Sequence, residues 1–444
     1  MDFQNIKPTP RWDIRTLIVA VTLFVGLESS SQAQSESQSL SLGQCYRAAQ
    51  ELSPLAAQNQ YYQSMATLRE KMANTGNYPQ IDLNGQLSYQ SDVFVLPFED
   101  PTMETPEIPR DQYRLSAGLN QKIFDGGSVK RTRALIEAEA AVNQQQVAVD
   151  LYQIRTIINN LFFGALVNQE NAAIMEAQLT TLREQLSEVE SKVKNGVLLA
   201  SNADIIKKEI LSAEQRLIVF SIDTRAFKDM LEDWTGEEIS DARSLLAPDL
   251  SAFDKSTLEI NRPELHLFNL QNQHLEAQQQ LTVIKNYPRL SAFFNGGVAS
   301  PNPFNLFETD LSGYYLTGVT LKWKVFDWNR NKNDIKTLDF QRKVISSHRA
   351  DFEHRVSIDL VQSDAEIRKL EELLKRDQEI LELQQRIVEA SYAQLQNGVI
   401  TSTNYITELN KETLDKLALN LRTLSLLRTK IDKLTKSGNY ETDI

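Results

Sequence analysis

Side chains that could carry catalysis or bind a metal ion are few in this sequence of 444 residues. The four histidines are His266, His274, His348 and His354, and no two lie three or four residues apart, the spacing that places a pair on one turn of a helix. Cys45 is the only cysteine, so it cannot form a disulfide within the chain, and we interpret it as a structural thiol. An active site would combine a nucleophile, a base and an orienting group. No such set is present, and we expect no enzymatic activity, no metal site and no cofactor.

The charge balance restricts the class of partner. The chain carries 47 lysines and arginines against 59 aspartates and glutamates, a formal net charge of −12 at pH 7. Nucleic-acid binding requires a positively charged face for the phosphates, so we expect no nucleic-acid partner. The 18 phenylalanines, 13 tyrosines and four tryptophans allow a folded core, which argues against general disorder.

The first 33 residues have the pattern of an export signal. Two arginines precede an apolar run at 17–27, and the small-x-small sequence at 31–33 fits a cleavage site. The run is shorter than the roughly 20 residues that a membrane-spanning helix needs. We therefore expect a signal peptide at 1–33 and a mature start at Gln34, with a retained anchor as the alternative. Since no later stretch is long and apolar enough to span as a helix, membrane insertion would have to use strands.

Two stretches far apart in the sequence make the same junction. "QKIFDGGSVK" and "KWKVFDWNRNK" each end an alternating apolar run on Phe-Asp, at Phe124-Asp125 and at Phe326-Asp327. Each then leads directly into a long polar segment. "FDGG" is too short to indicate phosphate binding, so a role in capping a helix is the better interpretation.

Further motifs recur in the same order. Asn-Tyr-Pro opens both "NYPQIDLNGQLSY" and "NYPRLSAFFNGGV", and an Asn-Gly-Val motif follows each Phe-Asp junction at an identical spacing. Ordered self-similarity of this kind indicates a tandem duplication. We expect a first repeat at 34–240, a linker or equatorial segment at 241–261, a second repeat at 262–437 and a C-terminal tail at 438–444.

Between the motifs the sequence favours unusually long helices. Proline is absent from 110–247, and apolar residues recur at three- and four-residue steps, as in a coiled coil. The expected helices are at about 41–76, 128–195 and 203–234 in the first repeat and at about 262–286, 329–397 and 403–437 in the second.

Local signals mark where these helices should begin and end. Pro79 and Pro288 should end the first helix of each repeat, because proline moves the residue before it out of helical geometry. Gly196 and Gly398 should cap the long helices in a left-handed conformation and form the tips of two helical hairpins. Asp204, three residues after Ser201, gives the spacing of a capping box that would begin the returning helix.

Alternating polarity predicts four strands, at about 80–90, 112–124, 289–299 and 314–326. One interpretation is a soluble antiparallel sheet with one solvated face. The other is a membrane barrel, with lipid on the apolar face and water on the polar face. Strand lengths near ten residues and aromatic side chains near the strand ends favour the barrel. Four strands cannot close a barrel, and open edges are not tolerated in lipid, so several chains would have to share one.

Taken together, the motifs resemble the TolC family of outer-membrane efflux proteins, from about Leu40 to Leu434. The resemblance is carried by "RPEL" at 262–265, the two Tyr-Pro turns, "FDGG" and "FDWN", and the two Asn-Gly-Val tips. It implies a mainly α fold with a small β part, in which two tandem repeats of long coiled-coil hairpins each add two antiparallel strands to a shared membrane barrel. That barrel would have twelve strands in a homotrimer in the outer membrane, above a helical barrel in the periplasm.

The same resemblance implies partners and a gate. A periplasmic adaptor (membrane fusion protein), an inner-membrane RND or ABC pump and outer-membrane lipid would be the partners. In the family, acidic residues near the second tip form a constricting ring, but Asn404 and Thr407 occupy those places here, and Asn202 the first-repeat place. Asp204 and Glu408 lie nearby and are the alternative gate carboxylates. Both could equally be solvated helix residues.

We therefore expect a passive exit duct of an efflux or type I secretion system, driven by the inner-membrane pump. A periplasmic adaptor is one alternative, although an adaptor needs a single hairpin flanked by β domains. A structural coiled-coil protein is the other, although it gives no reason for strands with a polar face and clustered aromatic residues. The transported substrate is not encoded in any motif that the sequence shows.

Overall fold

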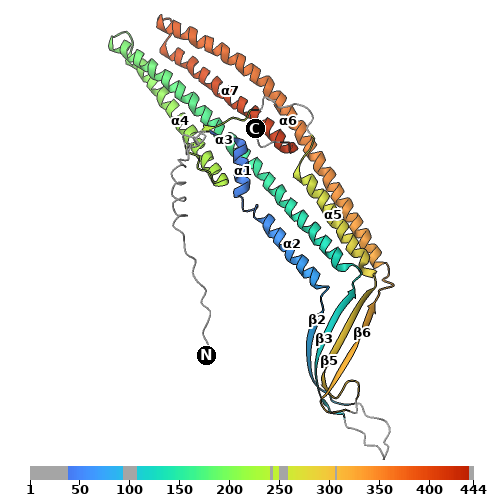
Figure 1. Cartoon of the computed structure of the whole chain (residues 1–444). Coiled ribbons are helices and arrows are strands. Elements are labelled where there is room, and N and C mark those ends of the chain that lie inside the picture. Colours follow the sequence, from blue (N-terminus) through green and yellow to red (C-terminus); the bar gives the residue numbers. More distant parts are fainter. Residues whose placement is uncertain (1–38, 94–107, 241–243, 250–258, 306–307, 440–444) are drawn as a thin grey trace, which may run out of the picture.

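The computed structural model describes residues 39–93, 108–240, 244–249, 259–305 and 308–439. The expected signal peptide lies outside the described residues, as do parts of the expected linker and of the C-terminal tail. The described chain is mainly helical and long, with four strands at one end and the tips of two helical hairpins at the other (Figure 1).

Two very long helices run along the molecule. α3 (Ser128–Lys194) and α6 (Arg330–Gln396) each contain 67 residues, which corresponds to about 100 Å at a rise of ~1.5 Å per residue. α4 (Ala200–Thr235) and α7 (Ser402–Ser437), of 36 residues each, return antiparallel to them and complete the two hairpins. Helices of this length are stabilised by packing against each other rather than by propensity alone.

Shorter helices lie beside the halves of α3 and α6 that lead to the sheet. α1 (Leu42–Leu52) contacts α3 and α4, α2 (Gln58–Thr75) contacts α3, and α5 (Pro263–Val283) contacts both α3 and α6. A single 3₁₀ turn, η2 (Ile284–Asn286), follows α5. Two short helices and one returning helix together thus accompany the long helix α3 along its length.

Three local expectations were wrong. The helix expected at 41–76 is two helices, because the chain leaves helical geometry at Ser53, directly before Pro54. α4 begins at Ala200 after the extended residue Leu199, so Asp204 lies inside the helix and Ser201 does not cap it. The last strand ends at Lys322 rather than near 326.

The four main strands form one antiparallel sheet in the order β2-β3-β5-β6. Their bounds are β2 Gln80–Tyr89, β3 Asp111–Phe124, β5 Arg289–Ser300 and β6 Ser312–Lys322. A bulge interrupts the register of β3 against β5 between Lys122 and Phe124. The described sheet is open, so β2 and β6 are edge strands of a single chain. A separate parallel pair, β1 (Ser39–Leu40) with β4 (Ser244–Leu245), lies near the middle of the molecule.

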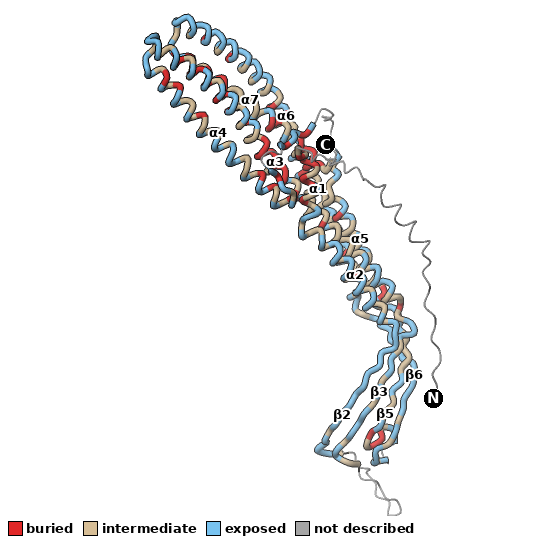
Figure 2. Tube along the Cα trace, turned by 60° about the vertical axis from the view of Figure 1, so that its left-hand side comes forward, coloured by how far each residue is buried: buried red, intermediate tan, exposed pale blue. Residues whose placement is uncertain are grey.

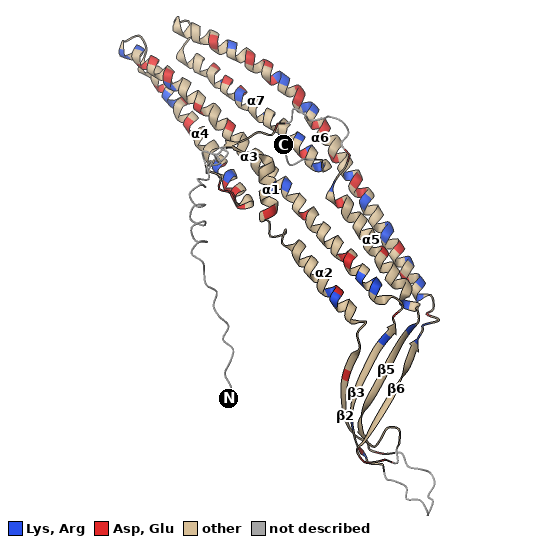
Figure 3. Ribbon diagram, in the orientation of Figure 1, with Lys and Arg blue, Asp and Glu red and all other residues tan. Residues whose placement is uncertain are grey.

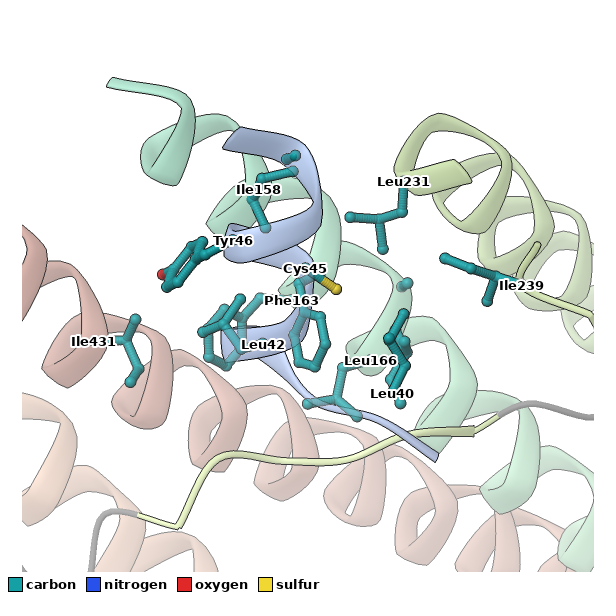
Figure 4. Close-up of a cluster of buried hydrophobic side chains, with 14 of the residues drawn as sticks. Leu40, Leu42, Cys45, Tyr46, Ile158, Phe163, Leu166, Leu231, Ile239 and Ile431 are labelled. Carbon is teal, nitrogen blue, oxygen red and sulfur yellow. The ribbon is translucent and has the colours of Figure 1, made fainter. Parts of the chain in front are cut away.

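The main hydrophobic core lies where α1 packs against α3, α4 and α7. Cys45 and Tyr46 of α1 meet Phe163 of α3, and Ile431 of α7 lies across from them (Figure 4). The hydroxyl of Tyr46 donates to Oδ1 of Asn159, a buried residue of α3. No helix among the described residues is long and apolar enough to cross a membrane. A second buried cluster lies toward the tips, where α3, α4 and α7 meet, whereas the sheet is exposed on nearly all of its surface (Figure 2).

Candidate functional site: strand–helix junctions, a two-faced sheet and a helical tip

The first Phe-Asp junction caps a helix. Asp125 accepts hydrogen bonds from the backbone N–H of Gly127, at 2.8 Å, and of Val129, at 2.7 Å. These N–H groups lie at the start of α3, where no helical carbonyl can accept from them, and the carboxylate also complements the helix dipole. Gly126 and Gly127 have φ of 71° and 82°, the left-handed region that makes the sharp turn from strand to helix possible.

The second junction uses the same device with different neighbours. Oδ2 of Asp327 accepts from the backbone N–H of Asn331 and from the side-chain amide of Asn286, both at 2.9 Å. The hydrogen bond from Asn286, followed by that from the Asn331 backbone, lowers the pKa of this carboxyl below its usual value. Trp328 and Asn329 make the turn with φ of 57° and 61°, where the first junction uses two glycines.

Aromatic residues and prolines surround the junctions. Phe326 packs edge-on against Trp328 with ring centroids 4.8 Å apart, and both side chains are exposed, as is Phe124. Pro79 comes directly before β2, and Pro288 directly before β5. Exposed aromatic side chains at the end of a membrane strand belong at the level of the lipid headgroups.

One face of the sheet is mainly apolar and the other mainly polar, although Phe293 of β5 and Leu316 of β6 lie on the polar face. Cross-strand neighbours on one face are apolar in β2, β3 and β5, as in the row Ile81, Leu119 and Phe294. A row on the other face contains Asn84 and Ser116. Large apolar side chains on the first face are strongly exposed, with Leu83 at 75% and Leu87 at 80%. A sheet that buried this face inside a soluble protein would not leave such side chains in solvent.

At the opposite end, the two tips have the same geometry. Gly196 and Gly398 have φ of 74° and 71°, and an added Cβ at either would meet nothing within 4 Å. Glycine is therefore required at both tips by the backbone conformation and not by close packing. Val197, Leu199 and Val399 beside them are at least 70% exposed.

The tip residues expected near a gate have mostly structural contacts. The side chains of Asn202 and Thr407 bond to backbone carbonyls of their own helices, and the N–H of Asn404 bonds to the cap residue Thr401. Glu408 is paired with Lys411 and accepts from Gln384 at 3.0 Å. The pKa of Glu408 is lowered, first by Lys411 and then by Gln384.

Asp204 differs from the other residues expected near the gate. It is exposed on α4, and its side chain makes no hydrogen bond or ion pair with a described residue. Its charge raises the pKa of Lys207, although Glu190 is the larger cause. The structure thus leaves one carboxylate of the expected set available to solvent at the tip.

A contact between the two hairpins was not expected from the sequence. Oε1 of Glu188 on α3 accepts from Lys192 at 2.7 Å and from Gln396 of α6 at 2.6 Å. Lys192 also reaches Gln396 at 3.2 Å, and the Tyr392 hydroxyl lies 3.5 Å from Glu188. We call these four residues the tip clasp. The pKa of Glu188 is lowered, first by the hydrogen bond from Lys192.

The side chains able to bind metal are scattered. Among the residues that the structure describes, no three of His, Cys, Asp or Glu gather as they would around a metal ion. Cys45 is fully buried in the core and Gly164 of α3 lies against Phe227 of α4, which gives both residues a packing role.

Known structures resemble the whole described fold. CusC, whose study concerns folding and transmembrane channel formation, aligns with a TM-score of 0.67 and 12% identity, over 90% of this chain and 92% of its own. VceC, an outer membrane protein of Vibrio cholerae, aligns with a TM-score of 0.63 and 13% identity, over 89% of this chain and 96% of its own. The CmeC outer membrane channel of Campylobacter jejuni aligns with a TM-score of 0.63 and 13% identity, over 91% of this chain and 87% of its own. No family model and no curated protein matches the sequence. The chain therefore has the fold of the TolC-type outer-membrane channels.

Proposed function

We propose that this protein is a passive exit duct of the outer membrane. Three copies would close their sheets into one twelve-stranded barrel, with lipid outside and water inside, and their hairpins would form a helical barrel in the periplasm. The observation that carries the proposal is the exposed apolar face of the sheet, which lies opposite a mainly polar face in the same four strands.

Open sheet edges support an assembly of several chains. Within the described residues β2 and β6 each have a strand partner on one side only. Unpaired N–H and C=O groups cost several kcal/mol each in lipid, about the loss of a hydrogen bond without replacement. Pairing β2 of one copy with β6 of the next would satisfy both edges. The two hairpins of equal helix length are the expected products of a tandem duplication.

Apolar stripes on the hairpins support the same assembly. Leu211, Ile218 and Ile222 form an exposed stripe on α4 at helical spacing. Exposed Ile380 and Ile387 lie one heptad apart on α6. Contacts with neighbouring copies would cover these stripes, as a coiled-coil seam is covered.

The exposed tip is the expected docking place for a periplasmic adaptor. Val197, Leu199 and Val399 present apolar side chains at the end farthest from the sheet. An adaptor bound there would connect the duct to an inner-membrane pump of the RND or ABC class, in efflux or in type I secretion. The pump would supply the energy, so that no residue of this chain performs bond chemistry.

The rival functions predict different surfaces. An adaptor of this size would place β domains beside a single hairpin, and a structural coiled coil would have no reason to expose Leu83 and Leu87 on a sheet. Both rivals would be extracted without detergent. The membrane duct would be found in the outer-membrane fraction and would migrate faster on electrophoresis before heating than after it.

The test of the proposed function uses the full chain expressed in a bacterium with an outer membrane. We expect outer-membrane fractionation, heat-modifiable mobility, and ion current when the detergent-solubilised protein is added to a planar bilayer. A water-soluble protein with none of these three properties would contradict the proposal.

A further inference from the structure

We propose that the sheet end of the duct is positively charged and selects anionic substrates. This inference rests on the proposed function, because the polar face of the sheet must line the lumen. It concerns a part of the molecule that the expected tip gate does not involve. The chain as a whole is acidic, so a local excess of positive charge is not a consequence of composition.

Charges on the sheet are few and are almost all on the polar face. The four main strands contain six charged residues, and the register places five of them on that face: Asp82, Arg114, Lys122, Arg289 and Lys322. The sixth is the first residue of β3, at the end remote from the helices. Four cations against one carboxylate therefore face the expected lumen. The sheet is otherwise nearly free of charge, whereas the helices carry many charges of both signs (Figure 3).

The positive charge is densest at the second strand–helix junction. A pocket of about 420 Å³ lies there, between the base of β5 and β6 and the start of α6. Five cationic side chains and two carboxylates line it, a formal excess of three positive charges. The charged lining residues are Lys285, Arg289, Lys322, Lys324, Arg330, Asp327 and Asp334.

The two carboxylates do not neutralise the pocket. Asp334 faces Lys285 at 3.6 Å, and Asp327 is engaged by the N–H of Asn331 and the amide of Asn286. The other four cations form no ion pair with any residue that the structure describes. Arg289 and Lys322 are cross-strand neighbours, so two of these cations stand directly side by side. Like charges opposite each other destabilise a sheet, and an anion between them would relieve that repulsion.

The corresponding region of the first junction is balanced. The pocket there is lined by two cations, Lys130 and Arg133, and by two carboxylates, Asp125 and Glu137. The first tip is balanced too, because residues 188–209 contain four acidic and four basic side chains. Of these described regions, only the second junction and the polar face of the sheet carry a net positive charge, and this asymmetry would not arise from the duplication itself.

Closure of the barrel would strengthen the effect. Rotational symmetry would repeat the four unpaired cations in every copy, around one water-filled passage. A passage walled by protein and lipid focuses the field of such charges, which raises the local concentration of counter-ions. Substrates with carboxylate, sulfate or phosphate groups would be favoured there, and organic cations would be disfavoured.

The experiment measures the reversal potential of single channels in a planar bilayer across a KCl gradient. Wild-type channels should be anion-selective, with a chloride-to-potassium permeability ratio of about 2 or more. The variant Arg289→Gln/Lys322→Gln/Lys324→Gln should lower that ratio by about twofold or more. Pyrophosphate should block the wild-type current, and the variant should need ~5-fold more for the same block.

A matched control removes the same number of charges elsewhere. Lys369, Lys375 and Arg376 lie far along α6 and each pairs with a glutamate three residues away. Changing all three to Gln should leave the permeability ratio unchanged. Cation-selective wild-type channels, or an equal loss of selectivity in the control, would overturn the inference while the proposed function stands. The absence of any current would contradict the proposed function, and the inference with it.

Discussion

At the scale of single residues, the two aspartates of the Phe-Asp junctions have the clearest physical role. Each lies between a strand and a 67-residue helix and supplies an acceptor for backbone N–H groups in the first turn of that helix. The turn itself is made by two glycines in one case and by Trp328 and Asn329 in the other. The motif recurs because a strand that becomes a helix needs both a sharp turn and a cap.

Loss of the first cap should loosen the start of α3. Asp125→Ala should destabilise the first turn by ~1 kcal/mol. The Val129 amide hydrogen should then exchange with solvent about fivefold faster. Asp125→Asn should have a smaller effect, since asparagine also caps. Hydrogen exchange measured by mass spectrometry on peptides from the start of α3 would report both. Equal exchange in all three proteins would show that the carboxylate does not hold this turn.

The tip clasp should respond to pH. The pKa of Glu188 lies below the usual 4.5, since Lys192 and Gln396 bond to its charged form. The stabilisation is therefore fully present above pH 4.5 and is lost as the pH falls through the lower, folded-state value. We expect the distribution of distances between spin labels at Val197 and Val399 to broaden below that pH.

A matched pair of variants isolates the clasp. Glu188→Gln should make the label distance broad at neutral pH and insensitive to acid. Glu190→Gln is the control, because Glu190 pairs with Lys207 within its own hairpin, at 2.9 Å, and does not reach the second one. If both variants keep the wild-type pH response, the clasp does not hold the hairpins together.

Among the tip carboxylates, Asp204 should matter most for cation block. Glu408 is held by Lys411 and Gln384, whereas Asp204 is exposed and has no described partner. Asp204→Asn should weaken block of single-channel current by divalent cations by about twofold or more, and Glu408→Gln should change it less. Equal block in wild type and both variants would remove this tip from ion binding.

At the scale of elements, close packing of α3 on α4 depends on one glycine. A Cβ on Gly164 would stand 2.7 Å from the ring of Phe227, closer than a Cβ normally comes to another side chain. Gly164→Leu should therefore lower the free energy of unfolding by about 1–3 kcal/mol through overpacking. Adding Phe227→Ala should recover part of the loss, measured by thermal denaturation in detergent. No recovery would mean that the cost arises elsewhere.

The elements also show how far the sequence alone could lead. The mainly helical fold with a small sheet could be predicted, because periods of 3.6 and 2 are local properties of the chain. The break at Ser53 was missed, although Pro54 was a signal for it. The tip clasp could not be foreseen, since Glu188 and Gln396 are distant in sequence and meet only through tertiary packing.

The charged pocket was missed for a similar reason. Its cations come from η2, from β5, from the end of β6 and the residues after it, and from the start of α6. They do not form a run of basic residues in the sequence. The expected gate rested on a resemblance and not on a local sequence pattern. Asn404 and Thr407 stand where a constricting ring was implied by resemblance, and their contacts here are those of helix residues.

At the scale of the whole molecule, the faces of the sheet decide where the protein can reside. Leu83→Lys would place a charge on the apolar face, and Asn84→Lys would place the same charge on the polar face of the same strand. Lysine facing lipid costs up to about 2–4 kcal/mol near the bilayer midplane. Leu83→Lys should therefore reduce the amount of protein in the outer membrane severalfold, and Asn84→Lys should not. Equal amounts of both would contradict the assignment of the faces.

Several surfaces of the described chain are exposed or unpaired within one copy. Among the described residues of one copy, no strand pairs with the outer edges of β2 and β6. The apolar stripe on α4 and the apolar side chains of the tip are exposed there too. One arrangement, a ring of copies with lipid outside and water inside, would cover all but the tip, which the proposed adaptor would cover. The most direct test is the mass of the purified full chain by native mass spectrometry, with and without detergent. Three chains per particle, stable only with detergent, is the predicted result, and a detergent-independent monomer would contradict it.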